Sequence, residues 1–315
     1  MLAHGGGFDV AAAIASLKAR YGADIIAVTM DLGQGHVFEE LRDRALAGGA
    51  SRAHVLDLRE TFASSYVLPS LKADALDAGG VPLPSSLARA VIADKLVEMA
   101  AIEQASAVAH VASAADGDGA VLDTAIRAVN PSLEVITVDS HTGTGDEAAA
   151  CVTVNLWGRT IARPAGTELP ERLYKLTRPV ASAPAEAATI ELQFERGVPV
   201  SVNRVPMPLV ELIATVAHLA GAHGVGRMQT ANAVVEAPAA AVLHLAHRAV
   251  PGGQPSGAER DRVRRQYADI IAGGEWATAA RAALDKKVNK WQQRANGAVR
   301  LRVFRGECHS VTHAD

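Results

Sequence analysis

The first half of the chain alternates two kinds of hydrophobic pattern. Continuous apolar runs, typical of strands buried on both faces, cover residues 24–29, 53–58, 107–111 and 133–138. Stretches with apolar residues at helical spacing lie between them, over residues 37–47, 61–76, 87–104 and 121–129. This alternation predicts an α/β fold with a parallel sheet covered by helices on both faces.

A further helix is expected directly after a glycine run near the N-terminus. Its apolar residues, which recur at helical spacing, are Val10, Ala13, Ile14 and Leu17. Asp9 precedes them and is a candidate N-cap, because its carboxylate can accept backbone N–H bonds. The chain starts abruptly before the glycines, so we expect only a short first strand, and a mis-called start codon or a trimmed strand would explain it.

The second half of the chain has a different pattern. The apolar periodicity stops at residues 139–150, and residues 189–203 alternate around Arg196-Gly197, which predicts a β-hairpin. Helices are expected over residues 208–222, 239–249 and 260–272, and a late strand over residues 298–304. We therefore expect two domains, an α/β domain over residues 1–145 and an α+β domain over residues 146–315.

Composition and charge exclude several function classes. Only 4% of the 315 residues are aromatic, which leaves little ring surface for stacking nucleic-acid bases. The net charge of −3, with scattered Lys and Arg, provides no basic field for nucleic acid or for an anionic membrane. Neither a signal peptide nor an apolar stretch of membrane-spanning length is present in the sequence. We expect a cytoplasmic protein without nucleic-acid or membrane partners.

Four residues that could carry metal or thiol chemistry have a simpler interpretation. His244 and His247 share one helical face, but no carboxylate or cysteine pattern accompanies them, so we expect partly exposed helix residues rather than metal ligands. Cys151 is a lone cysteine without an adjacent base, which favours an inert thiol. His110 ends an apolar run, so it is expected to be structural or close to a nucleotide base.

The glycine run is the first motif with a chemical interpretation. Gly5, Gly6 and Gly7 follow a short strand and precede a helix, so consecutive backbone N–H groups and the helix dipole can hold an anion, above all a phosphate. The same turn also occurs where two stretches of backbone pack closely. The spacing alone leaves both interpretations open.

Longer stretches resemble one family. Residues 2–17 (LAHGGGFDVAAAIASL) resemble the pyrophosphate loop of the argininosuccinate synthases, and residues 27–35 (AVTMDLGQG) are similar to the adenine-side segment of that family. Further similar stretches follow in family order: SSLARAVIADKLVEMA at residues 85–100, NLWGRTI at 155–161, AHGVGR at 222–227 and GAVRLRVFRG at 297–306. The resemblance runs almost end to end.

The resemblance implies a fold and a reaction. The expected fold is a HUP-type, Rossmann-like parallel sheet joined to an α+β synthetase domain that lacks the C-terminal oligomerisation helix of the family. In that family ATP adenylates the ureido oxygen of citrulline, and the amine of aspartate then displaces AMP. Because the leaving groups are good, positioning and charge neutralisation matter more than an acid or a base. ATP and Mg2+ are the implied cofactors and amino-acid-like small molecules the implied ligands, with a homo-oligomer or a hetero-partner both open.

The resemblance also implies site residues. The nucleotide-side candidates are Ala3, Gly5, Gly6, Gly7, Asp9, Met30, Asp31, Gln34 and Val111. The substrate-side candidates are Ser86, Arg89, Ser113, Asp118 and Thr160. Asp9 and Asp118 are the candidate catalytic residues, through handling of magnesium pyrophosphate, and no metal site made by the protein alone is expected.

Some positions depart from the family pattern. Gly5 replaces a serine of the loop, and Val10 and Ala11 replace a threonine and a serine. Ala115 replaces a lysine, and Val121 an arginine that would face an aspartate carboxylate. Three hypotheses follow: a carbon–nitrogen ligase acting on an altered substrate pair, a catalytically degenerate paralogue acting as a binding or regulatory subunit, and argininosuccinate synthesis with replaced contacts.

Overall fold

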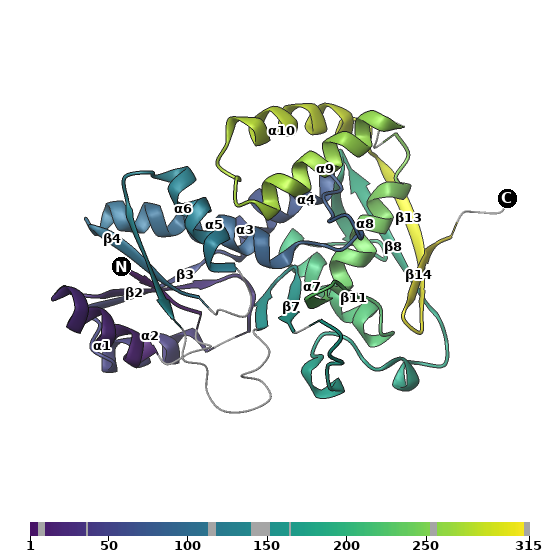
Figure 1. The fold of residues 1–315 in the computed structure, drawn as a ribbon. Coiled ribbons are helices and arrows are strands. Elements are labelled where there is room, and N and C mark those ends of the chain that lie inside the picture. The colour runs from purple at the N-terminus through teal and green to yellow at the C-terminus, as the bar shows by residue number, and fades with distance from the viewer. Residues whose placement is uncertain are drawn as a thin grey trace.

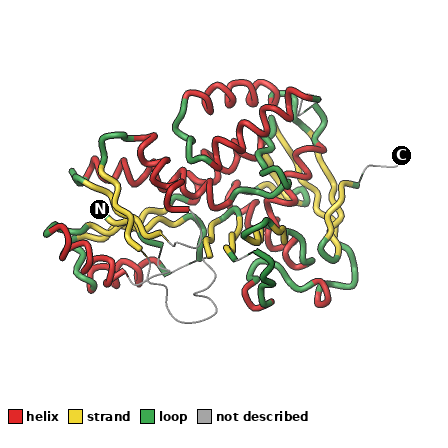
Figure 2. The backbone as a smooth tube through the Cα atoms, in the orientation of Figure 1, coloured by secondary structure: helices red, strands yellow, loops and turns green. Residues whose placement is uncertain are grey.

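The computed structural model of the chain is shown in Figure 1. It describes residues 1–5, 10–35, 37–112, 118–139, 152–163, 165–252 and 257–311. Strands gather beside the N-terminus, in the middle of the molecule and near the C-terminus (Figure 2).

A five-stranded sheet in which all pairs are parallel forms the N-terminal part, as predicted. Its order is β3-β2-β1-β4-β5. The strands are β1 (Leu2–Ala3), β2 (Ile26–Asp31), β3 (Arg52–Asp57), β4 (Ala107–Ala112) and β5 (Glu134–Asp139). The strand order reverses at β1, so the carboxyl ends of β1 and β4 form a topological switch point, where open α/β sheets bind ligands.

Helices cover both faces of this sheet. Figure 1 shows α1 (Val10–Tyr21) and α2 (Phe38–Ala47) on one face, and α5 (Pro84–Ile102) and α6 (Asp118–Val129) on the other. The predicted apolar stripe of α1 is buried, and it packs with Leu2, Ala27 and Ala109 of the sheet. The predicted α/β class is therefore confirmed.

The helix expected over residues 61–76 is interrupted. The structure has α3 (Arg59–Phe62), a π-helical turn η1 (Ala63–Val67) and α4 (Leu68–Lys72). Pro69 has no backbone N–H to donate to the carbonyl of Ser65, so a regular α-helix cannot continue through this position.

Two antiparallel sheets form the rest of the described chain. The first, in order β10-β9-β8-β13-β14, contains β8 (Ala188–Glu195), β9 (Val198–Val202), β10 (Val205–Pro206), β13 (Gly297–Phe304) and β14 (Glu307–Ser310). The second, in order β11-β12-β7-β6, contains β6 (Val152–Asn155), β7 (Gly158–Ala162), β11 (Arg227–Gln229) and β12 (Ala233–Glu236). The predicted hairpin around Arg196-Gly197 is confirmed as β8–β9.

Four helices accompany these sheets. They are α7 (Leu209–Ala222), α8 (Pro238–Ala249), α9 (Ala258–Ala272) and α10 (Ala279–Gln292), with short 3₁₀ turns η2 (Glu171–Leu173) and η3 (Val180–Ser182). The first three were predicted. The fourth was not, because only Val288 and Gln292 of α10 are buried and its apolar stripe is weak.

The main hydrophobic core extends through both parts of the chain. It joins Val28 of the parallel sheet, Trp157 of the β6–β7 turn and Leu192 of β8 in one cluster of buried residues. The domain boundary expected at residue 145 lies outside the described residues, so that division stays a prediction.

The expectation of exposed histidines on α8 is wrong. His244 is 3% and His247 0% exposed, because α8 packs against α4, α7, β7 and β13 on several sides at once. His244 Nδ1 donates to Asp74 Oδ1 at 3.0 Å, and Arg248 Nε donates to Asp74 Oδ2 at 2.8 Å. Burial raises the pKa of Asp74, but these two bonds outweigh it and lower the pKa to about 2.

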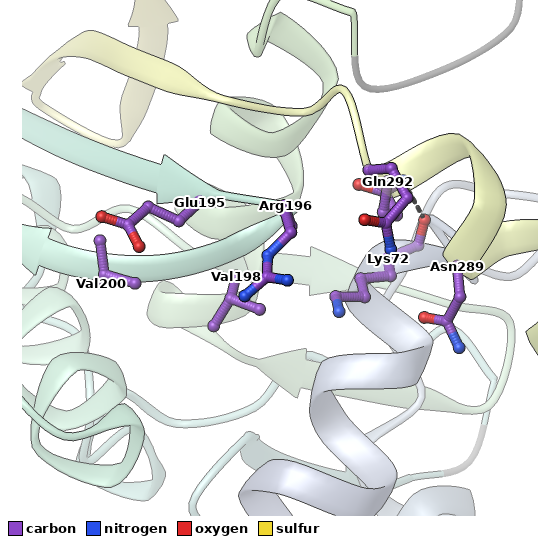
Figure 3. Close-up of a pocket in the computed structure, with 8 residues that line it drawn as sticks. Lys72, Glu195, Arg196, Val198, Val200, Asn289 and Gln292 are labelled. Carbon is purple, nitrogen blue, oxygen red and sulfur yellow. Dashed lines mark hydrogen bonds between the residues drawn. The ribbon is translucent and has the colours of Figure 1, made fainter.

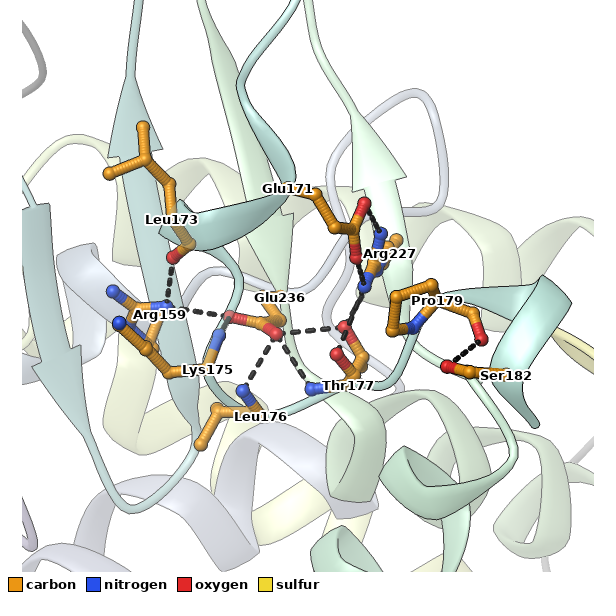
Figure 4. Close-up of polar contacts among 10 residues, drawn as sticks. All are labelled: Arg159, Glu171, Leu173, Lys175, Leu176, Thr177, Pro179, Ser182, Arg227 and Glu236. Atoms are coloured by element: carbon orange, nitrogen blue, oxygen red, sulfur yellow. Dashed lines mark hydrogen bonds and ion pairs between the residues drawn. The ribbon is translucent and has the colours of Figure 1, made fainter. Parts of the chain in front are cut away.

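A buried carboxylate organises the β11-β12-β7-β6 sheet and the segment beside it (Figure 4). Glu236 is 0% exposed and accepts a bond from Arg159 Nη1 at 2.8 Å. The backbone N–H groups of Lys175, Leu176 and Thr177 and the Thr177 hydroxyl donate to the same carboxylate. These bonds fix residues 175–177 against the ends of β7 and β12, and they satisfy a charge that burial alone would strongly disfavour.

We expect Glu236→Gln to destabilise the fold by about 3 kcal/mol, because it leaves the buried Arg159 guanidinium without a counter-charge. The measurement is urea unfolding followed by circular dichroism. Glu307→Gln is the matched control, since the Glu307 side chain is 74% exposed. Equal unfolding midpoints for the two variants would contradict the structural role of Glu236.

Candidate functional site

The candidate site lies at the carboxyl edge of the parallel sheet, at the switch point. Ala3 ends β1 and pairs with Val28 and His110 of the neighbouring strands. Further nucleotide-side candidates lie at or beyond the ends of these strands: Gly5, Met30, Asp31, Gln34 and Val111. The structure thus gathers residues from three separate stretches of sequence at one edge.

Several candidates cannot be placed. Gly6, Gly7, Asp9 and Ser113 lie outside the described residues, as does Cys151. Asp118 begins α6, but its side chain also lies outside the described part.

No sequence pattern indicates the contact that fixes β1 beside β2 at this edge. His4 is buried, its backbone N–H donates to the Val28 carbonyl at 3.0 Å, and its Nε2 hydrogen-bonds Thr29 Oγ1 at 2.8 Å. Burial lowers the pKa of His4 from 6.5 to about 4, so the ring is neutral at neutral pH. His4 therefore supports the loop that follows it without adding positive charge for a phosphate.

The loop after β2 is shaped by two of the candidates. Asp31 Oδ1 accepts from Gly33 N at 2.8 Å, and the side chain of Arg59 lies 3.4 Å from Asp31 Oδ2. Gln34 Oε1 accepts from Leu32 N at 2.5 Å, while Gln34 Nε2 donates to the Met30 carbonyl at 2.8 Å. Asp31 and Gln34 thus hold residues 30–34 in one conformation.

The turn between β6 and β7 joins this loop to the rest of the site. Leu156 N donates to the Leu32 carbonyl at 2.7 Å. Asn155 Nδ2 donates to the Pro84 carbonyl at 2.9 Å, at the start of α5. Gly33 has φ +93°, and a Cβ there would lie 3.1 Å from Leu156 N, so the close approach requires glycine.

The substrate-side candidates with described side chains lie on elements that pack together, α5 and the β6–β7 hairpin. Ser86 and Arg89 belong to the first turns of α5, and Arg89 is only 7% exposed. Thr160 of β7 pairs with Thr153 of β6, whose hydroxyl hydrogen-bonds the hydroxyl of Ser85. Because α5 packs on β6 and β7, the structure brings together residues about 70 positions apart in the sequence.

His110 fits the structural interpretation. It is 2% exposed, and its Nε2 lies 2.6 Å from Asp123 Oδ1 on α6. This contact fixes α6 against the end of β4.

The departures from the family pattern have different surroundings. Val10 is buried in the cluster under α1, and the Cγ1 atom of Val121 would lie 3.3 Å from a Cβ added at Gly274. Ala11 packs where Gly48 lets α1 and α2 approach closely. Gly5 is exposed, and a Cβ there would meet no atom of the described residues within 4 Å. Packing thus accounts for an apolar side chain at position 10 and a small one at position 11, while among the described residues none requires glycine at position 5.

In the described part of the chain, no helix is long and apolar enough to cross a membrane. No three His, Cys, Asp or Glu side chains among these residues gather as a metal site.

Comparison with known proteins decides the family. The protein-family model described as "Arginosuccinate synthase N-terminal HUP domain" matches residues 1–149. The family model described as "Arginosuccinate synthase C-terminal domain" matches residues 152–313. The chain belongs to the argininosuccinate synthase family. The resemblance found in the sequence is confirmed, and so is the HUP-type fold that it implied.

Curated relatives agree with this assignment. The argininosuccinate synthase of Dehalococcoides mccartyi is 34% identical over 99% of this chain and 85% of its own length. That of Gloeobacter violaceus is 35% identical over 97% of this chain and 86% of its own. The argininosuccinate synthase of a Nostoc species is 33% identical over 99% of this chain and 86% of its own length.

We expect Gly33→Ala to destabilise the fold by about 1–2 kcal/mol and to speed hydrogen exchange at the Leu156 amide, because the added Cβ meets Leu156 and φ stays positive. Gly22→Ala is the matched control, since Gly22 has φ +62° with nothing within 4 Å of an added Cβ. Hydrogen exchange followed by mass spectrometry tests both variants. Equal exchange at Leu156 in the two variants would show that Gly33 is not needed for this contact.

Proposed function

We propose that this chain is an ATP-dependent carbon–nitrogen ligase of the argininosuccinate synthase type. The acceptor oxygen of citrulline or a similar ureido or carboxyl compound attacks the α-phosphorus of ATP, and pyrophosphate leaves. The amine of aspartate or a similar compound then attacks the adenylated carbon, the carbon–oxygen bond to AMP breaks, and the amine loses a proton. The observation that carries this proposal is that the loop after β2, the start of α5 and the β6–β7 turn converge at the switch point of a family member.

Named residues support separate parts of this reaction. We assign the nucleotide to the ends of β1, β2 and β4, where Asp31 and Gln34 hold the adenine-side loop. Ser86, Arg89 and Thr160 are assigned to the acceptor, because α5 packs on β6 and β7 and a buried guanidinium group suits a carboxylate. Mg2+ would enter with the triphosphate, with Asp9 and Asp118 as the proposed residues that handle it.

A second candidate function is a binding or regulatory subunit without catalysis. The observation in its favour is Gly5, which removes a loop hydroxyl without any packing reason. The packing roles of Val10 and Ala11 weaken the case for degeneracy at those two positions. A cytoplasmic location, and assembly with further copies or with a hetero-partner, stay predictions.

We expect the wild-type chain with Mg2+ to bind ATP at sub-millimolar concentration and to release AMP only when both acceptor and amine are present. Calorimetry and an AMP assay with citrulline and aspartate test this.

Arg89→Ala should raise the KM for the acceptor at least about tenfold while ATP binding is kept, because one charge-assisted contact is lost. Lys95→Ala on the same helix, outside the proposed site, should behave as wild type. No ATP binding at about 10 mM would contradict the ligase and favour the subunit.

We expect Gly5→Ser to tighten ATP binding about tenfold, because the open position accepts a hydroxyl that can donate to a phosphate oxygen. Gly5→Ala supplies the Cβ without the hydroxyl and should leave the affinity near that of wild type. Calorimetric titration of the three proteins measures the difference. If Ser and Ala have the same effect, no phosphate oxygen lies within reach of position 5.

A further inference from the structure

A cavity of about 410 Å³ lies apart from the candidate site, where α4, the β8–β9 hairpin and α10 meet (Figure 3). Lys72 lines it from α4, Arg196 from the hairpin turn and Asn289 from α10. Val198 and Val200 form an apolar wall. The cavity shares no lining residue with the switch point, and its size is in the range of small-molecule sites.

Two cations face each other in this cavity. Figure 3 shows the ammonium group of Lys72 and the guanidinium group of Arg196 pointing toward one another, with Val198 beside the guanidinium group. Partial burial, and then the nearby charge of Arg196, lower the pKa of Lys72. Among the residues that the structure describes, no carboxylate pairs with either side chain, and Figure 3 shows the carboxylate of Glu195 turned toward Val200 instead.

Polar contacts hold the backbone that carries both cations. Gln292, 1% exposed, donates from Nε2 to the Lys72 carbonyl at 3.1 Å. On the other side, the backbone N–H of Arg196 donates to Asn296 Oδ1 at 2.9 Å. A Cβ at Gly197 would lie 2.1 Å from Gln292 Oε1, so the hairpin turn can approach only with glycine there. The end of α4 and the hairpin turn, from which the two side chains extend, are therefore held close together.

The backbone at Arg196 adds a second, independent observation. Arg196 has φ +49°, in the left-handed region, at the first position of a two-residue hairpin turn. Asn, Asp and Gly occupy this position with less strain than arginine. The turn thus carries a long cation where a small residue would fold more easily, and this cation points into the cavity.

We propose that this cavity binds a small molecule carrying at least two negatively charged oxygen atoms, as in a phosphate compound or a dicarboxylate. Such an anion removes the repulsion between Lys72 and Arg196. The guanidinium group offers a planar fork of donors, the ammonium group a point charge and the Asn289 amide a further donor. This anion site is independent of the proposed ligase activity, because none of its residues belongs to the candidate site at the switch point.

The test is calorimetric titration of the full chain with pyrophosphate and, separately, with succinate at low ionic strength. Binding of either anion should weaken at least about tenfold in Lys72→Met and in Arg196→Asn. Both variants should fold, because methionine keeps the apolar stem and asparagine suits the left-handed backbone. Lys290→Met on α10, outside the cavity, should bind like wild type. Because pyrophosphate is also a product of the proposed ligase, Asp9→Ala should weaken only binding at the nucleotide site and keep the binding that depends on Lys72, which separates the two sites.

Nuclear magnetic resonance of ¹³C-labelled lysine gives a local readout. The pKa of Lys72 should rise when the anion binds, because a negative charge stabilises the ammonium form. Three outcomes would overturn the proposal: no binding at about 10 mM anion, unchanged binding in Lys72→Met and Arg196→Asn, or loss of the Lys72-dependent binding in Asp9→Ala. The proposal would also be overturned if the chain self-associates, Lys72→Met dissociates it and neither anion binds. The two cations would then belong to an interface with a second copy of the chain.

Discussion

The contact between the β6–β7 turn and the loop after β2 is the constraint on which the candidate site depends. Leu156 N donates to the Leu32 carbonyl at 2.7 Å, and Asn155 ties the same turn to the start of α5. Trp157, 1% exposed, anchors the turn in the shared core. One backbone bond, one buried side-chain bond and buried packing thus place the nucleotide-side loop and the substrate-side helix at fixed positions relative to each other. Neither group of residues could act on a common ligand if this turn were displaced.

The parts of the fold that the sequence predicted share a physical cause. Strands buried on both faces require continuous apolar runs such as residues 107–111, and such runs can be recognised in the sequence whatever packs around the strand. Helix α10 leaves too few buried residues to give a pattern, and Pro69 breaks a helix whose apolar spacing looks regular. His244 was misjudged because the periodicity of one helix cannot reveal that several other elements pack around it.

The candidate site was predictable only where local sequence determines position. Strand ends gather at one edge of a parallel sheet, so the positions of Ala3 and Asp31 follow once the strands are identified. Some contacts join distant stretches of the sequence, such as His4 with Thr29 and Ser85 with Thr153. No hydrophobic periodicity in the sequence indicates such pairs. The family resemblance supplied the substrate-side candidates instead, and the structure explains their proximity through the packing of α5 on β6 and β7.

Charge pairing distinguishes the two parts of the molecule in which ligands are proposed. The carboxylate of Glu236 is matched by Arg159 and by backbone donors, and the carboxylate of Asp74 is matched by His244 and Arg248. Such buried charges serve the fold, because their partners leave little capacity for anything else. Lys72 and Arg196 break this rule within the described chain, since each lies near the positive charge of the other and neither pairs with a described carboxylate. A charge arrangement that costs the isolated fold energy is explained most simply by a ligand of opposite sign.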